Sequence, residues 1–414
     1  MLIKRILTMV VLAASLGPVP AVSQSCGNTK LSCLLPTAFH TNAGTFNFFN
    51  EAFGTQIAQL PLATPASGFV FTFNRELGVY SASQESFGPL LAERPETIGR
   101  GKAYLAFTYQ HFQLSQIDGN DLRHLSILFT FPEAPPQVVT ETENRVDSKV
   151  DQFVAFGTLG LTDRVDISLA VPYDRISLAA NSSGTEFSTT SNAQTTFSQF
   201  VSGRAHGIGD IVASAKGTVL SMERLSLALG AEFRFPTGDE RNFVGSGAYG
   251  IKPYVVLARR GRVTPHLNLS YQWNTASILA ADQNQKPQNL PGFVGYAAGA
   301  DIGITPRLTV VADWTGQHFF SAPQISGPRS VPATVAGNPA SFSSVQLISG
   351  SYAVNDLGVG VKANPVKHLL ITANLTIKLD NGGLRARVVP LAGISYSFSD
   401  LKLGIFRRCP CDKK

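Results

Sequence analysis

The sequence predicts an all-β fold, a transmembrane antiparallel β-barrel of about 12–14 strands with short periplasmic turns and long extracellular loops. Three observations lead to this prediction. The chain begins with residues typical of an export signal, apolar and polar residues alternate with a period of two over segments of about 9–11 residues, and short turns alternate with long polar connections. A tilted strand needs about 9–11 residues to cross the core of a bilayer.

The first element, residues 1–23, is predicted to be a secretory signal peptide. Lys4 and Arg5 form a positive start, residues 6–16 are apolar, and residues 21–23 (Ala-Val-Ser) are small enough for cleavage. A lipoprotein signal is the alternative, but residues 23–25 (Ser-Gln-Ser) match poorly the small residues that such a signal needs before Cys26. We therefore expect export from the cytoplasm.

Charge and hydropathy narrow the class of protein. The 414-residue chain carries 34 Lys and Arg and 28 Asp and Glu; removal of residues 1–23 takes two basic residues, so the net charge falls from +6 to +4. This charge is too small to indicate a nucleic-acid partner. The mean hydropathy of +0.08 is high for a soluble enzyme. No apolar run after the leader is long enough for a membrane-spanning helix.

All four cysteines lie near the chain ends, at Cys26, Cys33, Cys409 and Cys411. In an exported protein an even number of cysteines indicates disulfides, and a zinc site with four thiolates is the alternative. An even number of strands would place both chain ends in the periplasm. A Cys409–Cys411 bridge would close a very small, strained ring, so we expect at least one bridge between the two chain ends.

The alternation of faces is clearest in four segments, residues 165–173, 225–235, 263–273 and 368–378. In the first of them Val165, Ile167 and Leu169 face one way, and Asp166 and Ser168 face the other. Aromatic residues gather toward the segment ends, as in residues 233–235 and 271–273. Outer-membrane barrels carry such aromatic girdles at both membrane interfaces.

The connections between strands sort by length. Short turns occur at residues 162–164, 221–224, 259–262, 305–307 and 364–367, and long polar connections occur at residues 177–207, 236–250, 274–292 and 320–352. Twelve strands follow if residues 102–113 pair with residues 149–161. Residues 69–80 and 123–131 would raise the number to fourteen, which we favour. Both numbers are even, as in bacterial barrels.

Gly245, Gly247 and Gly250 match the spacing G-x-G-x-x-G of dinucleotide-binding proteins. That motif requires a following helix to receive the pyrophosphate. Here the next residues are Ile-Lys-Pro and then Tyr-Val-Val-Leu, which favours a strand. The glycines are therefore assigned to a long outward loop and the start of the next strand, and no nucleotide is expected.

Residues 207–219, 227–258 and 266–274 resemble a family of outer-membrane proteins assigned to a meta-pathway of phenol degradation, distantly like the channels for long-chain fatty acids and aromatic hydrocarbons. The resemblance rests on the G-x-G-D sequence at residues 207–210, P-T-G-D at residues 236–239 and G-S-G at residues 245–247. It covers roughly residues 100–400. It implies uptake of small apolar or aromatic compounds and offers no catalytic residues.

The resemblance also bears on the domain organisation, which we expect to be a signal peptide (1–23), an N-terminal periplasmic segment or plug (24–67), the barrel (68–400) and a periplasmic tail (401–414). In the fatty-acid channels an N-terminal segment plugs the lumen. The aromatic residues available for such a plug are Phe39, Phe46, Phe48, Phe49 and Phe53. The alternative is a periplasmic tail that packs on the rim of the barrel.

The candidate functional residues are the polar side chains that parity places inside the barrel. They are Asp210, Ser214, Lys216, Glu232, Arg234, His266, Asn268, Gln272, Asp313 and Gln317. They line either a solute path or a structural network in which Lys216, Glu232 and Arg234 pair with one another. His266 and Ser270 share the inward face but lie about 13 Å apart along a strand, too far for a nucleophile and its base.

The sequence therefore predicts a channel in the outer membrane of a Gram-negative-type bacterium, for passive uptake of small hydrophobic or aromatic solutes. The alternatives are an adhesin-like or structural barrel that binds a partner through residues 181–196, and a lipid-modifying enzyme. We expect no enzymatic activity, no catalytic residue, no cofactor and no bound metal. The expected partners are outer-membrane lipid, lipopolysaccharide and a small solute, and the sequence leaves the oligomeric state open.

Overall fold

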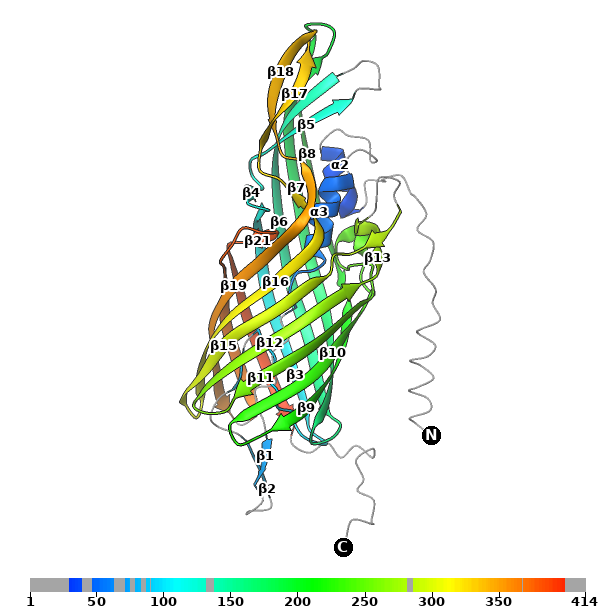
Figure 1. The fold of residues 1–414 in the computed structure, drawn as a ribbon. Coiled ribbons are helices and arrows are strands. Elements are labelled where there is room, and N and C mark those ends of the chain that lie inside the picture. Colours follow the sequence, from blue (N-terminus) through cyan, green and yellow to red (C-terminus); the bar gives the residue numbers. More distant parts are fainter. Residues whose placement is uncertain are drawn as a thin grey trace, which may run out of the picture.

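The computed structural model describes residues 30–38, 47–62, 71–74, 79–82, 87–89, 91–131, 138–280, 286–366 and 368–398. It shows a closed, antiparallel twelve-stranded barrel, with a tall extension above one part of its rim (Figure 1). The barrel strands are β3 (Ala103–Ile117), β6 (Val138–Gly160), β7 (Val165–Ser188), β9 (Ile211–Ser221), β10 (Leu225–Phe235), β11 (Gly250–Arg259), β12 (Val263–Asn274), β15 (Phe293–Thr305), β16 (Leu308–Ile325), β19 (Leu347–Val366), β20 (Leu369–Lys378) and β22 (Val388–Phe398).

The remaining elements are short or lie above or below the barrel. The strands are β1 (Phe71–Asn74), β2 (Val79–Ala82), β4 (Asn120–Asp121), β5 (Leu125–Phe131), β8 (Gln194–Ile208), β13 (Ala276–Ser277), β14 (Gln288–Asn289), β17 (Arg329–Val335), β18 (Asn338–Ser344) and β21 (Leu384–Ala386). The helices are η1 (Leu31–Cys33), α2 (Leu34–Ala38), α3 (Asn47–Ile57), η2 (Glu240–Asn242) and η3 (Ile278–Ala280). No helix in the described ranges has the length and hydropathy needed to cross a membrane.

The barrel closes through β3, which pairs with β22 on one side and with β6 on the other. The predicted barrel is confirmed, with twelve strands, and the favoured number of fourteen is wrong. Of the two extra segments, the described part of residues 69–80 belongs to the separate two-stranded sheet β1–β2, and β5 pairs with β6 above the barrel. Because β3 pairs with a barrel strand on each side, the ring of twelve strands is closed, so the barrel begins at Ala103 and not near residue 68.

The predicted alternation between the two faces is confirmed. In β10, Leu225, Leu229 and Phe233 are exposed on the outer face, whereas Ser226 and Ala228 are buried. The same alternation recurs in β12 and β20. A closed sheet satisfies its backbone hydrogen bonds internally, and its apolar outer face suits lipid. The protein is therefore a barrel of the outer membrane of a Gram-negative-type bacterium.

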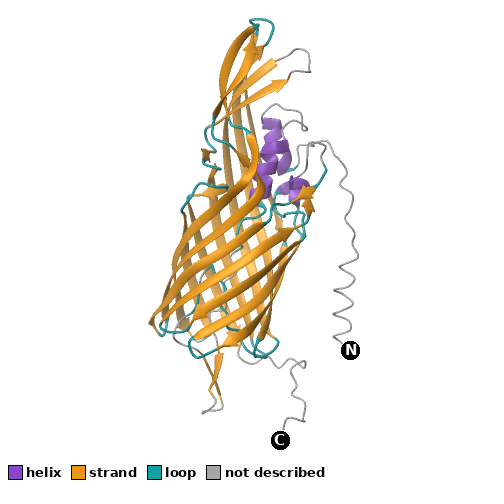
Figure 2. Ribbon diagram, viewed as in Figure 1, coloured by secondary structure: helices purple, strands orange, loops and turns teal. Residues whose placement is uncertain are grey.

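Two of the predicted long loops consist largely of strands (Figure 2). β7 continues to Ser188 and pairs with β8 from Tyr173 onward, so residues 177–207 form most of a long hairpin. Residues 320–352 contain the end of β16, the β17–β18 hairpin and the start of β19. The sequence predicts loops here because the Ser, Thr and Gly residues of these stretches form no apolar face. The structure differs because above the membrane neither face of a strand has to meet lipid.

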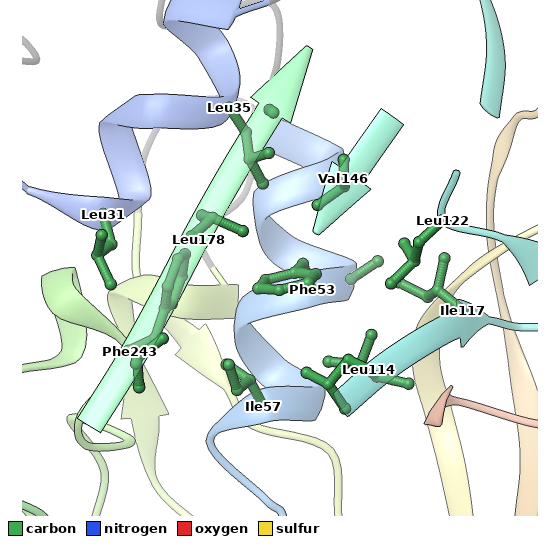
Figure 3. Close-up of a cluster of buried hydrophobic side chains, with 14 of the residues drawn as sticks. Leu31, Leu35, Phe53, Ile57, Leu114, Ile117, Leu122, Val146, Leu178 and Phe243 are labelled. Carbon is green, nitrogen blue, oxygen red and sulfur yellow. The ribbon is translucent and has the colours of Figure 1, made fainter. Parts of the chain in front are cut away.

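Helix α3 packs among inward-facing side chains of the upper barrel (Figure 3). Phe53 is fully buried and meets Phe243 edge-on, with ring centroids 5.6 Å apart. Ile57, Leu114 and Leu178 belong to the same buried cluster. Phe39 and Phe46 lie outside the described residues, and the side chains of Phe48 and Phe49 are not described. The residues before 30 and after 398, including the predicted signal peptide and C-terminal tail, also lie outside them.

Candidate functional site in the lumen

Residues of the G-x-G-D, P-T-G-D and G-S-G sequences contact one another at the extracellular end of the barrel, and we call this group of contacts the latch. Asp210, just before β9, accepts hydrogen bonds from the backbone N–H groups of Gly238 (3.2 Å) and Ser246 (2.8 Å), and from the Ser246 hydroxyl. Gly238 and Gly245 pass so closely that a Cβ on Gly245 would lie 2.6 Å from the Gly238 Cα. These glycines are needed for backbone contact within a loop, as predicted, and the loop is followed by strand β11.

Residues 87–89 and 91–98 cross the lower half of the lumen from wall to wall. At one wall Lys362 donates to the carbonyl oxygen of Pro89 (2.6 Å), and the Leu91 N–H donates to Asp313 (3.1 Å). At the other wall Lys216 donates to the Arg94 carbonyl oxygen (2.8 Å). Lys362 and Asp313 belong to β19 and β16, on the opposite side of the ring from β9, which carries Lys216. We call residues 87–89 and 91–98 the lower crossbar.

Residues 56–61 cross the lumen nearer the extracellular end, and we call them the upper crossbar. The Asn274 amide at the end of β12 donates to the Gln59 side-chain oxygen (3.4 Å). The Gln110 amide on β3 donates to the Pro61 carbonyl oxygen (3.2 Å). β3 and β12 lie on opposite sides of the twelve-strand ring. The upper crossbar therefore continues helix α3 down into the barrel.

A cavity of about 310 Å³ lies between the two crossbars. The upper boundary includes Gln56 and residues 59–62, and the lower boundary includes residues 91–93. Seven aromatic side chains line it, Phe112, Phe156, Tyr254, Phe293, Tyr296, Phe319 and Tyr352. An apolar cavity of about 150 Å³ is enough to hold benzene. The cavity can therefore hold a single substituted aromatic ring.

The charges that line the cavity are balanced. Three acidic residues (Glu93, Glu232, Asp356) face three basic ones (Arg234, Lys252, Arg385). Lys252 Nζ lies 2.7 Å from Glu232 Oε2, and Arg385 Nη2 lies 2.6 Å from Asp356 Oδ1. Because buried charges are costly unless paired, these pairs keep the wall polar without a strong net charge.

The structure divides the ten predicted lumen residues into two groups. Six line the cavity, namely Ser214, Glu232, Arg234, Asn268, Gln272 and Gln317. The other four also lie inside the barrel but are occupied by structural contacts: Asp210 in the latch, Lys216 and Asp313 on the lower crossbar, and His266, whose Nε2 lies 2.8 Å from Asp313 Oδ1.

The hypothesis that Lys216, Glu232 and Arg234 pair with one another is wrong. Lys216 binds Glu93 of the lower crossbar (3.0 Å), and Glu232 binds Lys252 on the neighbouring strand. Arg234 donates to Asn274 (2.7 Å) and lies 3.8 Å from Asp210. The alternation of faces along the strands correctly predicted that these three side chains point inward. Their ion-pair partners could not be predicted in this way, because these partners lie on the lower crossbar or are set by the register of neighbouring strands.

Sequence reasoning missed several cavity residues. Lys252 and Tyr254 lie on the inward-facing side of β11, and the alternation that starts at Gly250 could have predicted this direction. Arg385 belongs to the short strand β21, which lies between the barrel strands β20 and β22 in the sequence. A strand of three residues is too short to show a periodic pattern. No local pattern reveals residues 59–62 or 91–93, which lie outside helices and strands.

Within the described ranges no group of three or more His, Cys, Asp or Glu side chains could hold a metal ion. Cys33 is buried, and the other three cysteines lie outside those ranges. The disulfide and zinc hypotheses therefore stay predictions. Cys33 lies in η1, next to Lys30, whose Nζ is 2.7 Å from Asp239 of the extracellular 236–250 loop. The expectation that Cys33 lies in the periplasm is thus wrong.

The chain was compared with solved structures, curated proteins and protein families. An outer-membrane channel from Pseudomonas putida F1 is 12% identical, with a TM-score of 0.42 over 73% of this chain and 97% of that one. The toluene transporter TbuX of Ralstonia pickettii is 8% identical, with a TM-score of 0.35 over 73% of this chain and 90% of that one. A search of curated proteins found no match. Residues 132–327 match the family model described as "Putative MetA-pathway of phenol degradation", which confirms the resemblance of this chain to that family.

Proposed function

We propose that the protein is a channel for passive uptake of small hydrophobic or aromatic solutes across the outer membrane. The observation that carries the proposal is the cavity of about 310 Å³ in the middle of the barrel, lined by aromatic side chains and balanced charges. Ligand sites are typically concave, largely apolar and supplied with a few polar groups that fix orientation. A one-ring compound with a small polar substituent fits this description. The proposal includes no catalytic step.

The two crossbars interrupt the lumen above and below the cavity, so transport requires that each of them move at least transiently. The lower crossbar is held at both walls by charged side chains, whereas the upper crossbar is held by amide contacts and by the apolar seat of α3. Hydrogen bonds to charged groups are stronger than those between neutral groups. We propose that α3 and the upper crossbar act as a plug, and that they move first.

A flux experiment tests the cavity. Thr315 on β16 lines the cavity, and no hydrogen bond of its side chain is found among the described residues. Thr315→Trp should fill much of the space and slow entry of phenol and benzoate into proteoliposomes by about tenfold or more, because the solute would have to displace the indole and a barrier higher by about 1.4 kcal/mol slows a step tenfold. Thr315→Val is the matched control of unchanged size. Equal flux in both variants, with both folded, would refute the cavity as the solute path.

An adhesin-like role is the second candidate, and one observation favours it. β6 and β7 run for 23 and 24 residues and carry a Ser- and Thr-rich tip far above the cavity. Deletion of residues 183–198 would join Ser182 and Gln199, which are paired across the hairpin, and so shorten it without a change of register. Loss of cell attachment with unchanged solute flux would favour the adhesin, and the reverse result would favour the channel.

A further inference from the structure

The outer face of four neighbouring strands carries three parallel rows of side chains. The strands are β3, β6, β7 and β8, and each row is defined by directly paired residues. The first row is Tyr109, Phe153, Tyr173 and Ile208; the second is His111, Asp151, Arg175 and His206; the third is Gln113, Lys149, Ser177 and Arg204. The second and third rows lie on the extracellular side of the first.

The first row marks the edge of the lipid core. Phe153, Tyr173 and Ile208 are exposed on the outer face, and below them Phe107 and Leu169 are exposed as well. Tyrosine and phenylalanine at this position are typical of the aromatic girdle of a barrel. The next two rows therefore lie in the headgroup layer of the outer leaflet, since two residues along a tilted strand rise only about 5 Å.

Three cations surround one point in this layer. Lys149 and Arg204 lie on either side of Ser177, and Arg175 is two residues from Ser177 on the same strand. Diagonal neighbours in a sheet are about 7–8 Å apart, so these long side chains can reach a common ligand above Ser177. All three residues are exposed. Among the described residues none of the three has an ion-pair partner within 4.0 Å.

The nearest carboxylates already have partners. Asp151 accepts a hydrogen bond from the Tyr109 hydroxyl (2.8 Å) and lies 2.7 Å from His111 Nδ1. Asp147, one row further out, lies 3.3 Å from Arg145 Nε and 4.0 Å from Arg123 Nε. His206 Nδ1 lies 3.0 Å from the Tyr173 hydroxyl. Asp151 also interacts electrostatically with its paired residue Arg175 but forms no ion pair with it. Lys149, Arg175 and Arg204 therefore remain available to bind an anion from outside the chain.

We propose that Lys149, Arg175 and Arg204 bind the phosphate of a phosphorylated glycolipid in the outer leaflet. Guanidinium groups match phosphate oxygens in a bidentate geometry, and an ammonium group adds a point charge. The adjacent aromatic row supplies the apolar surface for the acyl chains of the same lipid. A ligand that combines both features at this depth is a membrane lipid, and a free phosphate would use only the cations.

Native mass spectrometry of the full chain in detergent, titrated with bisphosphorylated lipid A, tests the site. Each basic residue near a charged membrane surface contributes roughly fivefold in affinity, so the triple variant Lys149→Gln, Arg175→Gln, Arg204→Gln should bind about 100-fold more weakly. The matched control removes three exposed periplasmic cations, Arg224→Gln, Arg259→Gln and Arg307→Gln. It should bind within about twofold of the wild type.

Three outcomes would overturn the proposal. They are equal binding by the triple variant and the wild type, an equal loss in the control variant, and equal wild-type binding of dephosphorylated lipid A. Inorganic phosphate at millimolar concentration should leave the lipid bound, and complete displacement would show that the cations bind free phosphate instead. If the triple variant does not fold, the three single variants, each expected to lose about fivefold, decide the question.

Discussion

A single residue on a barrel strand meets either lipid or the contents of the lumen, and the two faces impose different requirements. Parity alone selects Ser226 as a lumen-facing position that should accept a charge. The structure shows that Ser226 is fully buried, with its hydroxyl lacking a partner among the described residues, so an arginine there has no space. Ser214, which lines the cavity, is the appropriate lumen-facing position.

We predict that Leu229→Arg destabilises the barrel by about 2–4 kcal/mol, because Leu229 is 52% exposed on the lipid face in the middle of β10. Ser214→Lys should cost much less, since Ser214 is paired directly with Glu232 on β10 and lines a cavity that Glu93 also lines. Unfolding in urea with lipid vesicles measures both variants. Equal stability of the two variants would mean that the assignment of faces in β9 and β10 is wrong.

We predict that Glu51 makes the packing of α3 inside the barrel sensitive to pH. Burial raises the pKa of the Glu51 carboxyl from 4.5 to about 7. A raised carboxyl pKa means that the seated helix favours the protonated form, so its stabilisation is complete below about pH 4.5 and is lost as pH rises through about 7. Hydrogen exchange should show α3 better protected at pH 5 than at pH 8. Glu51→Gln should abolish the difference; an unchanged pH dependence in that variant would exclude Glu51 as its source.

At the scale of elements, α3 and the lower crossbar are held inside the barrel by different forces. We predict that Phe53→Ala weakens the seat of α3 by about 3–5 kcal/mol, because a fully buried aromatic side chain is removed. Planar-bilayer recordings should then show a larger or more frequent conductance. An exposed substitution in the same part of the chain, Lys30→Gln, breaks only a half-exposed ion pair and should change the conductance little.

The lower crossbar offers a separate prediction. Lys362 is fully buried and donates to the carbonyl oxygens of Phe87 and Pro89. Lys362→Met keeps the length of the side chain but removes the donor, and an unsatisfied buried carbonyl costs about 1–3 kcal/mol. The crossbar should then become accessible to protease from the periplasmic side. A digestion pattern identical to that of the wild type would show that Lys362 does not hold this segment.

At the scale of the whole molecule, the alternation of turn and loop lengths fixes the orientation in the membrane. Ser191, at the exposed tip of the β7–β8 hairpin, should be labelled on intact cells after Ser191→Cys, by an impermeant thiol reagent. Arg224→Cys, in a periplasmic turn, should be labelled only after the outer membrane is opened. Arg260 is a poorer choice for the periplasmic position because it is paired with Glu96 (2.8 Å). Equal labelling on intact cells would reverse the orientation.

The position of Cys33 changes the prediction for the cysteines. η1 packs at the extracellular end, whereas β22 ends at Phe398, which pairs with Ala103 at the periplasmic end. A bridge between the chain ends would have to run the length of the barrel. We therefore predict a local Cys26–Cys33 bridge, which mass spectrometry of an unreduced digest would detect. Detection of a peptide in which Cys33 is linked to Cys409 or Cys411 would instead support the disulfide between the two chain ends.

The sequence by itself determined the barrel, its two faces and the short periplasmic turns. Each of these depends on neighbouring residues: the period of two is a property of the extended backbone, and a short turn joins strands that are adjacent in the chain. For the same reason the inward direction of Ser214, Asn268 and Gln317 could be predicted from parity.

The tertiary structure decided the number of strands, the crossbars and the cavity. Closure at twelve strands depends on the pairing of β3 with β22, which are far apart in the sequence. The lower crossbar depends on contacts such as Lys362 to Pro89, which are 273 residues apart, and segments of this kind carry no periodic signal. Such contacts arise only when ring closure brings opposite walls within reach of the same stretch of chain. The residues that fill the lumen, and the cavity that they leave, therefore follow from the closed barrel and not from any local pattern.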